Sequence, residues 1–233
     1  MPMQEHTLRA FDADIDGMRG TVITMGGLVE KQFERAVDSL PGGDLRLISQ
    51  VLTDEQTVNE LHLRADLLCN QILARRQPFA VDLREVLAAI HTVNDLERVG
   101  DEAKKIALKS RDMEGAGNRL GLPLDRVAGM ADSVRRMLEE ALDAFVRHDA
   151  SVAARLVECD ERVDADRETL RRDLMQRMST DPASVSAALD MIFVVQSIER
   201  IGDHAKNIAE YVVNVVEGVD RRHAPAAPRE AAG

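Results

Sequence analysis

Two acidic motifs in this chain carry the residue types and spacing of a metal site built from oxygen ligands. LERVGDEAKKIA begins at Leu96, and IERIGDHAKNIA begins at Ile198. Each motif places a glutamate and an aspartate four residues apart on a predicted helix, where like charges repel by a few tenths of a kcal/mol. A glycine between them costs the helix about 1 kcal/mol more. A cation bound to the carboxylates would explain why the sequence tolerates both penalties.

A second acidic pattern lies one predicted helix before each motif. DEQTVNE at 54–60 resembles CDERVDA at 159–165. If neighbouring helices are antiparallel, the patterns of each half converge, and several anions in a partly desolvated site need compensation. The candidate metal ligands are Glu55, Asn59, Glu97 and Asp101 in the first half, and Asp160, Asp164, Glu199 and Asp203 in the second half.

The first half offers one charge fewer, so we expect it to bind metal more weakly. His204 is a weaker candidate ligand, because it is directed about 100° away from Asp203 around the helix. The alternative to a metal is a solvated face of ion pairs. The cations that would fold back onto the acids in that case are Arg98, Lys104, Arg200 and Lys206. Whether a metal or ion pairs neutralise the acids, Gly100 and Gly202 allow a neighbouring helix or a ligand to approach the backbone.

Six long helices are predicted to position these residues. Prolines fall between the periodic segments, and aspartates such as Asp44 stand at helix starts. Asp82, with Glu85 three residues later, resembles a capping box. We see no period-two strand pattern bounded by turns. The expected helices cover 5–40, 44–76, 80–112, 123–147, 150–179 and 182–217.

The chain is also an internal repeat, because the motif returns after a shift of 102 residues, from Glu97 to Glu199. On the preceding helices the shift is 105 residues, from Glu55 to Asp160. We therefore predict an all-α fold of two tandem, pseudo-repeated three-helix bundles. The predicted domains are 5–115 and 120–217, followed by a disordered tail at 218–233.

Composition argues against several classes of partner. The 233 residues carry a formal net charge of −11, which argues against nucleic acid as the main partner and against direct binding to anionic lipid. No run approaches the ~20 apolar residues of a membrane span, and the N-terminus lacks the apolar segment of a signal peptide. The two cysteines, Cys69 and Cys159, are isolated, which suits a reducing cytoplasm.

The same motifs resemble the PhoU family of phosphate-specific transport system accessory proteins. Further segments that resemble this family are TMGGLVEKQFERAV at 24–37, ARRQPFAVDLREV at 74–86 and CDERVD at 159–164. The resemblance covers about residues 5–217 and implies two three-helix bundles, often in a homodimer. It also implies metal binding through the acidic motifs, with divalent or trivalent Fe, Mn, Mg or Zn as candidate ions. Asn59 departs from the acidic pattern of the family.

The resemblance further implies a non-enzymatic negative regulator of phosphate uptake and of the phosphate-starvation response. Such a protein is cytoplasmic and connects a phosphate ABC transporter, chiefly its ATPase subunit, to a membrane sensor histidine kinase. It reaches the inner face of the membrane through these partners, without inserting into the bilayer. When phosphate is plentiful, it favours the non-signalling state of the kinase.

Two other functions suit a helical bundle with acidic sites. A ferritin-like diiron oxidase requires paired E-x-x-H motifs, and this sequence contains none. The chain also lacks a GxxxxGK[ST] phosphate loop. A metal-storage or structural bundle without a signalling role is the remaining alternative. Phosphate-regulated transcription after deletion of the gene distinguishes it from a regulator.

Overall fold

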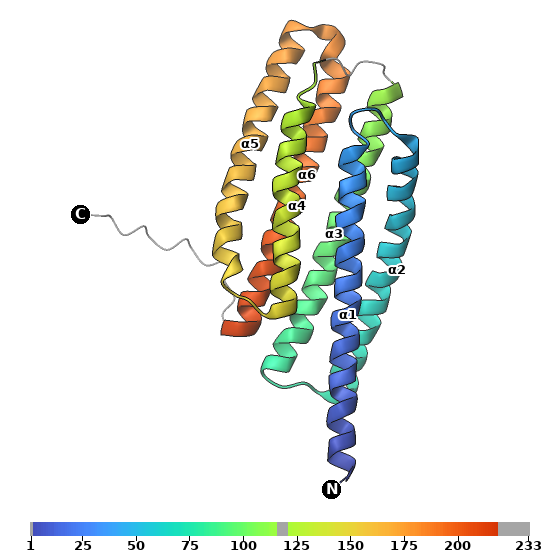
Figure 1. The fold of residues 1–233 in the computed structure, drawn as a ribbon, viewed down its shortest axis with the longest axis vertical. Coiled ribbons are helices and arrows are strands. Elements are labelled where there is room, and N and C mark those ends of the chain that lie inside the picture. Colours follow the sequence, from blue (N-terminus) through green and yellow to red (C-terminus); the bar gives the residue numbers. More distant parts are fainter. Residues whose placement is uncertain (1, 116–120, 219–233) are drawn as a thin grey trace, which may run out of the picture.

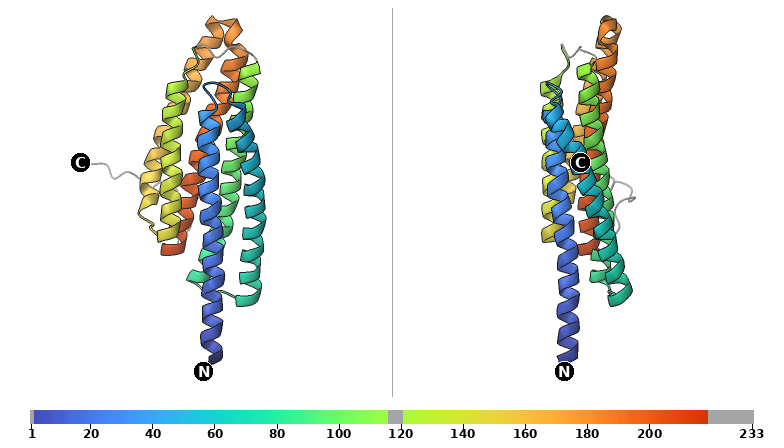
Figure 2. Two further views of the ribbon diagram at one scale, coloured as in Figure 1. Left: turned by 45° about the vertical axis from the view of Figure 1, so that its right-hand side comes forward. Right: turned by 90° about the vertical axis from the view of Figure 1, so that its right-hand side faces the viewer.

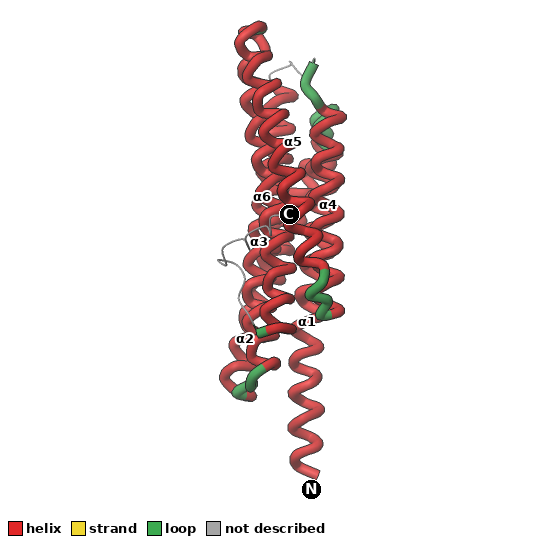
Figure 3. The backbone as a smooth tube through the Cα atoms, turned by 90° about the vertical axis from the view of Figure 1, so that its left-hand side faces the viewer, coloured by secondary structure: helices red, strands yellow, loops and turns green. Residues whose placement is uncertain are grey.

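The computed structural model describes residues 2–115 and 121–218, and it is built from long helices (Figure 1). A short 3₁₀ turn, Pro182–Ser184, leads into the last helix. The six helices are α1 (Pro2–Asp38), α2 (Leu45–Arg76), α3 (Val81–Gly115), α4 (Leu124–Arg147), α5 (Val152–Thr180) and α6 (Val185–Glu217). The two described ranges contain no strand, so the predicted all-α class is confirmed (Figure 3). Of the predicted tail, residues 219–233 lie outside the described residues.

Local capping explains where some helices begin. Asp44 caps α2, since its carboxylate accepts hydrogen bonds from the first backbone amides of the helix at 2.8 and 3.3 Å. The predicted capping box at Asp82 is wrong. Because α3 already begins at Val81, Asp82 lies inside the first turn, and the Glu85 carboxylate pairs with Arg19 of α1 instead of with a backbone amide.

The six helices form two bundles that lie side by side in a flat, elongated body (Figure 2). Helices α1, α2 and α3 contact one another, as do α4, α5 and α6. The two bundles meet mainly along α3 and α6, which share the largest interface, and α1 also contacts α4. One connected core of buried side chains runs through both bundles. No helix within the described ranges is long and apolar enough to cross a bilayer.

The α3–α6 interface is antiparallel, which places both acidic motifs near its middle. At one end, Lys109 of α3 donates to Asp190 of α6 at 2.8 Å. At the other end, Arg84 of α3 donates to the backbone carbonyl of Val215 at 3.2 Å. Each motif therefore lies against the opposite half of the molecule on one side and against its own α2 or α5 on the other.

Candidate functional site

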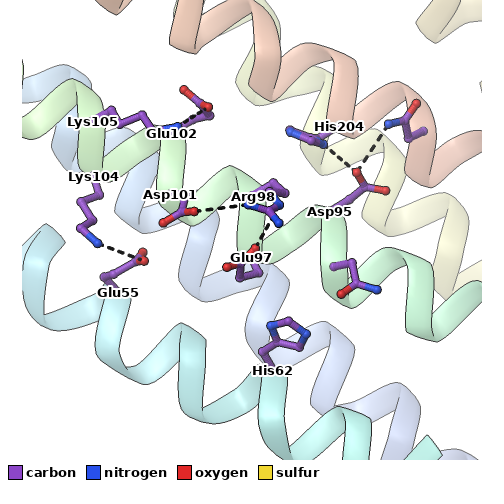
Figure 4. Close-up of polar contacts among 12 residues, drawn as sticks. Glu55, His62, Asp95, Glu97, Arg98, Asp101, Glu102, Lys104, Lys105 and His204 are labelled. Atoms are coloured by element: carbon purple, nitrogen blue, oxygen red, sulfur yellow. Dashed lines mark hydrogen bonds and ion pairs between the residues drawn. The ribbon is translucent and has the colours of Figure 1, made fainter.

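In the first half, Glu55 of α2 meets the acidic motif of α3. The Glu55 carboxylate is buried, accepts a hydrogen bond from Gln32 Nε2 at 3.1 Å, and lies 3.6 Å from Lys104 Nζ (Figure 4). Burial is the main cause that raises the pKa of Glu55; Gln32 and Lys104 oppose this rise, and contact with Asp101 adds to it. Glu55 and Asp101 therefore meet across α2 and α3, as the repeat pattern predicts.

The other first-half acids lie closer to solvent. Arg98 contacts both acids of its own motif, with Nε 3.4 Å from Glu97 and Nη1 3.8 Å from Asp101. The Arg98 side chain is 64% exposed, so it covers the acids from outside and is not held within the bundle. Asn59, one turn along α2 from Glu55, is exposed.

In the second half, Lys206 occupies the space between two carboxylates. Its Nζ contacts Asp160 of α5 and lies 3.2 Å from Oδ1 of Asp203. Burial lowers the pKa of the Lys206 ammonium, but the contacts with Asp160 and Asp203 outweigh it and raise the pKa. Asp160 is 8% exposed, and burial raises its pKa even though Lys206 opposes the rise.

Arg167 of α5 joins the remaining second-half acids. Its Nε lies 3.4 Å from Glu199, and its Nη2 lies 3.5 Å from Asp164. Burial, followed by repulsion from Asp203, raises the pKa of Glu199. The second-half acids thus meet two cations of the protein in pairs across α5 and α6: Lys206 joins Asp160 to Asp203, and Arg167 joins Asp164 to Glu199. The sequence identified Lys206 but not Arg167 as one of these cations.

The repeat is also recognisable in known proteins. A sequence model of the PhoU domain matches residues 22–109 and again residues 127–212. This chain belongs to the PhoU family. The phosphate-specific transport system accessory protein PhoU homolog of Pseudomonas aeruginosa is 40% identical over 223 residues, which cover 95% of this chain and 91% of the relative. The accessory protein PhoU of Escherichia coli (strain K12) is 35% identical over 221 residues, with 95% and 91% covered.

Solved PhoU structures have the same fold. The crystal structure of PhoU from Pseudomonas aeruginosa matches with a TM-score of 0.86 at 40% identity, covering 90% of this chain and all of that chain. A regulatory PhoU protein from Streptococcus pneumoniae matches with a TM-score of 0.82 at 24% identity, covering 90% and 98% of the two chains. The family resemblance seen in the motifs is therefore confirmed.

Two buried oxygen atoms lie beside Gly100 in the first half. Among the described residues, no three His, Cys, Asp or Glu side chains are arranged to enclose a metal. However, Oε1 of the fully buried Gln32 has no hydrogen-bond partner in the described part of the chain. A Cβ atom added to Gly100 would lie 3.1 Å from this oxygen and 3.1 Å from Glu55 Oε2. Two buried oxygens thus lie close to the backbone of Gly100, and a larger residue at this position would crowd both of them.

Sequence reasoning missed a polar cluster in the α3–α6 interface. Nδ1 of His204 lies 2.6 Å from Oδ1 of the buried Asp95, and Tyr211 donates to Oδ2 at 2.7 Å. His91 packs against the Tyr211 ring, with 5.1 Å between the ring centroids. His204 Nδ1 and Asp95 Oδ1 share a hydrogen bond whose donor depends on the tautomer of the imidazole. His204 therefore joins the two halves, and Asp95, at the repeat position of a serine in α6, is the signal that could have revealed the cluster.

Proposed function

We propose that this PhoU-family chain is a non-enzymatic negative regulator of phosphate uptake and of the phosphate-starvation response. The observation that carries the proposal is the match, over 95% of this chain, to relatives named as accessory proteins of a phosphate-specific transport system. The match covers 91% of each of these relatives, so it is not confined to one part of them. The proposed partners are the ATPase subunit of a phosphate ABC transporter and a membrane sensor histidine kinase.

The proposed mechanism is a shift in a partner's equilibrium between two states. An adaptor favours the non-signalling state of a kinase by binding that state more tightly than the signalling state. To make the favoured state tenfold more populated, the difference in binding free energy must reach about 1.4 kcal/mol. The flat body of six helices offers long faces for two partners at once (Figure 2). The chain would work in the cytoplasm, as a homodimer, at the inner face of the membrane.

Deletion of the gene in its own host tests the proposed regulation. At high external phosphate, we expect the deletion to raise both transcription from a phosphate-starvation promoter and uptake of radioactive phosphate. Wild-type protein supplied in trans should return both to their low level. A chain that carries Asp173→Asn should complement the deletion as the wild type does, because Asp173 pairs with Arg126 on an exposed face. This variant controls for the loss of one surface charge. A metal-storage protein would leave both readouts unchanged, and that result would refute the regulatory role.

The acidic motifs are proposed to bind a divalent or trivalent ion of Fe, Mn, Mg or Zn. Their carboxylates are oxygen donors of the kind these ions accept, and burial of Glu55 and Asp160 favours neutralisation by a cation. Mass spectrometry of tag-free protein should find bound metal in wild type and none after Asn replaces both Asp101 and Asp203. Absence of metal from the wild type would leave the acids as an ion-paired face that is available to a basic partner.

A further inference from the structure

The turn between α2 and α3 holds an aromatic side chain in water. Phe79 is 86% exposed, the largest exposed fraction of any large apolar side chain among the described residues. QPFAV at 77–81 corresponds to DPASV at 181–185 in the turn before α6, so Phe79 stands where the second half has Ala183. A turn at this point of the repeat therefore forms with alanine, and the fold does not explain the phenylalanine.

The backbone on both sides of Phe79 is strained. Gln77 and Ala80 each have a φ of 48°, a left-handed conformation that residues other than glycine rarely adopt. The corresponding turn of the second half avoids it, because Asp181 has a φ of −135° and accepts a hydrogen bond from the Ala183 amide at 3.1 Å. Strained backbone that a fold retains is typical of functional sites. The strained first-half turn therefore indicates a function for the residue that it presents.

A hollow of about 330 Å³ lies beside Phe79, at the end of the first bundle where α2 turns into α3 next to α1 (Figure 1). Phe11 of α1 also lines this hollow, so two aromatic rings from separate segments border the same space. The remaining lining residues are Arg75, Arg76, Gln77, Pro78 and Asp82. An open space of this size with two aromatic walls accepts an apolar side chain of another molecule.

The hollow is locally cationic, although the whole chain has a net charge of −11. Its lining contains two arginines and one aspartate. Arg76 donates to Asp14 of α1 at 2.9 Å, whereas Arg75 is exposed and its side chain pairs with no residue in the described part of the chain. Arg75 is therefore available to a carboxylate from outside. Aromatic residues and arginine are also the types that are enriched in protein–protein interfaces.

We propose that Phe79 and Arg75 form a docking site for a segment of a partner protein that carries an apolar side chain next to a carboxylate. The apolar side chain enters the hollow between Phe79 and Phe11, and the carboxylate pairs with Arg75. Because the turn already fixes Phe79, little conformational freedom is lost when the partner docks. A lipid surface fits less well, since anionic headgroups repel a chain of this net charge. The inference rests on the proposed adaptor function and names a surface through which it would act.

Binding of the tag-free, full-length chain to the two proposed partners tests this docking site. The sensor kinase and the assembled phosphate transporter of the same host are each placed in nanodiscs, and affinity is measured by biolayer interferometry. We expect Phe79→Ala, which installs the second-half residue, to weaken binding to at least one partner about tenfold or more. Arg75→Gln should weaken the same interaction. Added salt should then weaken the wild type more than Arg75→Gln, because salt screens exposed charge pairs.

Leu67→Ala is the matched control, since Leu67 of α2 is 62% exposed and lies outside the hollow. It removes an exposed apolar side chain and should change affinity less than about twofold. Empty nanodiscs control for contact with lipid. Circular dichroism and thermal unfolding of every variant establish that the fold is retained.

The outcomes separate this inference from the function on which it rests. Wild-type affinity of Phe79→Ala for both partners, or equal weakening by Phe79→Ala and Leu67→Ala, overturns the docking site but leaves the adaptor function in place. Wild-type binding to empty nanodiscs that is lost in Phe79→Ala assigns the turn to lipid and also overturns the protein docking site. A wild-type chain that binds neither partner overturns the adaptor function and the docking site together.

Discussion

Alanine substitution at the two motif glycines should have opposite effects on stability, although the glycines occupy equivalent positions of the repeat. In the interior of a helix, glycine is less favourable than alanine by about 1 kcal/mol. At Gly202 the new Cβ would be 3.5 Å or more from neighbouring side chains, which is ordinary contact. Gly202→Ala should therefore raise the free energy of unfolding by about 0.5–1 kcal/mol.

At Gly100 the gain in helix propensity is offset by crowding. The new Cβ would lie 3.1 Å from Gln32 Oε1, 3.1 Å from Glu55 Oε2 and 3.4 Å from a Val58 methyl carbon. Gln32 and Glu55 would have to move apart, which weakens a buried hydrogen bond to a charged group worth about 1.5–3 kcal/mol. We expect Gly100→Ala to lower the free energy of unfolding by about 1 kcal/mol, the difference between these two terms.

Thermal and urea unfolding, followed by circular dichroism, measure both effects. The two variants should differ by about 2 kcal/mol, which corresponds to about 4–8 °C in Tm for a chain of this size. Equal stabilisation by both substitutions would refute the close approach of Gln32 and Glu55 to Gly100. Equal destabilisation would show that the surroundings of Gly202 are as tight as those of Gly100, in conflict with the structure.

Three further substitutions or modifications test contacts elsewhere in the molecule. Tyr211→Phe removes the hydrogen bond to the buried Asp95 and should lower the free energy of unfolding by about 1.5–3 kcal/mol in urea titrations; an unchanged midpoint would contradict that contact. Iodoacetamide at pH 8 should modify Cys159 and spare Cys69, as mass spectrometry can show, because burial raises the pKa of Cys69 to about 11. Burial, and to a smaller extent the charge of neighbouring acids, raises the pKa of Glu30. Ionisation of its carboxyl therefore lowers the free energy of unfolding. Glu30→Gln should therefore be more stable than wild type at pH 7, and the gain should vanish once wild type is protonated below about pH 4; a gain that persists at pH 3 would exclude this cause.

The positions of the helices were accessible from sequence because local signals mark their ends. Asp44 begins α2 by accepting hydrogen bonds from nearby amides, an interaction that depends only on adjacent residues. Asp82 has the same local signature, yet it lies inside α3, because Glu85 finds a stronger partner in Arg19 of a distant helix. Tertiary ion pairing therefore overrides capping where the capping residue is also within reach of another helix.

The acids of the candidate site could be found from sequence, whereas their partners could not. The carboxylates repeat at a fixed spacing, and that spacing is visible without a structure. Arg167 and Gln32 contact these acids because the packing of α5 and α1 brings them to the motifs. An isolated arginine or glutamine has no distinctive sequence pattern that would predict such a contact. A position-by-position comparison of the two halves does single them out. At the shift of 105 residues, Gln32 corresponds to Met137 and Arg167 corresponds to His62, so both residues differ in chemical type from their counterparts.

The crosswise contacts between α3 and α6 determine which helices can pair. Asp95 of α3 faces His204 of α6, while Ser197 of α6, the counterpart of Asp95, lies against Glu102 of α3. Two copies of α3 in the same arrangement would bring Asp95 against Glu102 at both ends of the contact, burying carboxylates against one another. A single three-helix half of this protein is therefore unsuited to closing on a copy of itself. The two halves are therefore unequal partners: the repeat is visible in the arrangement of the helices, but not in the residues that join the halves.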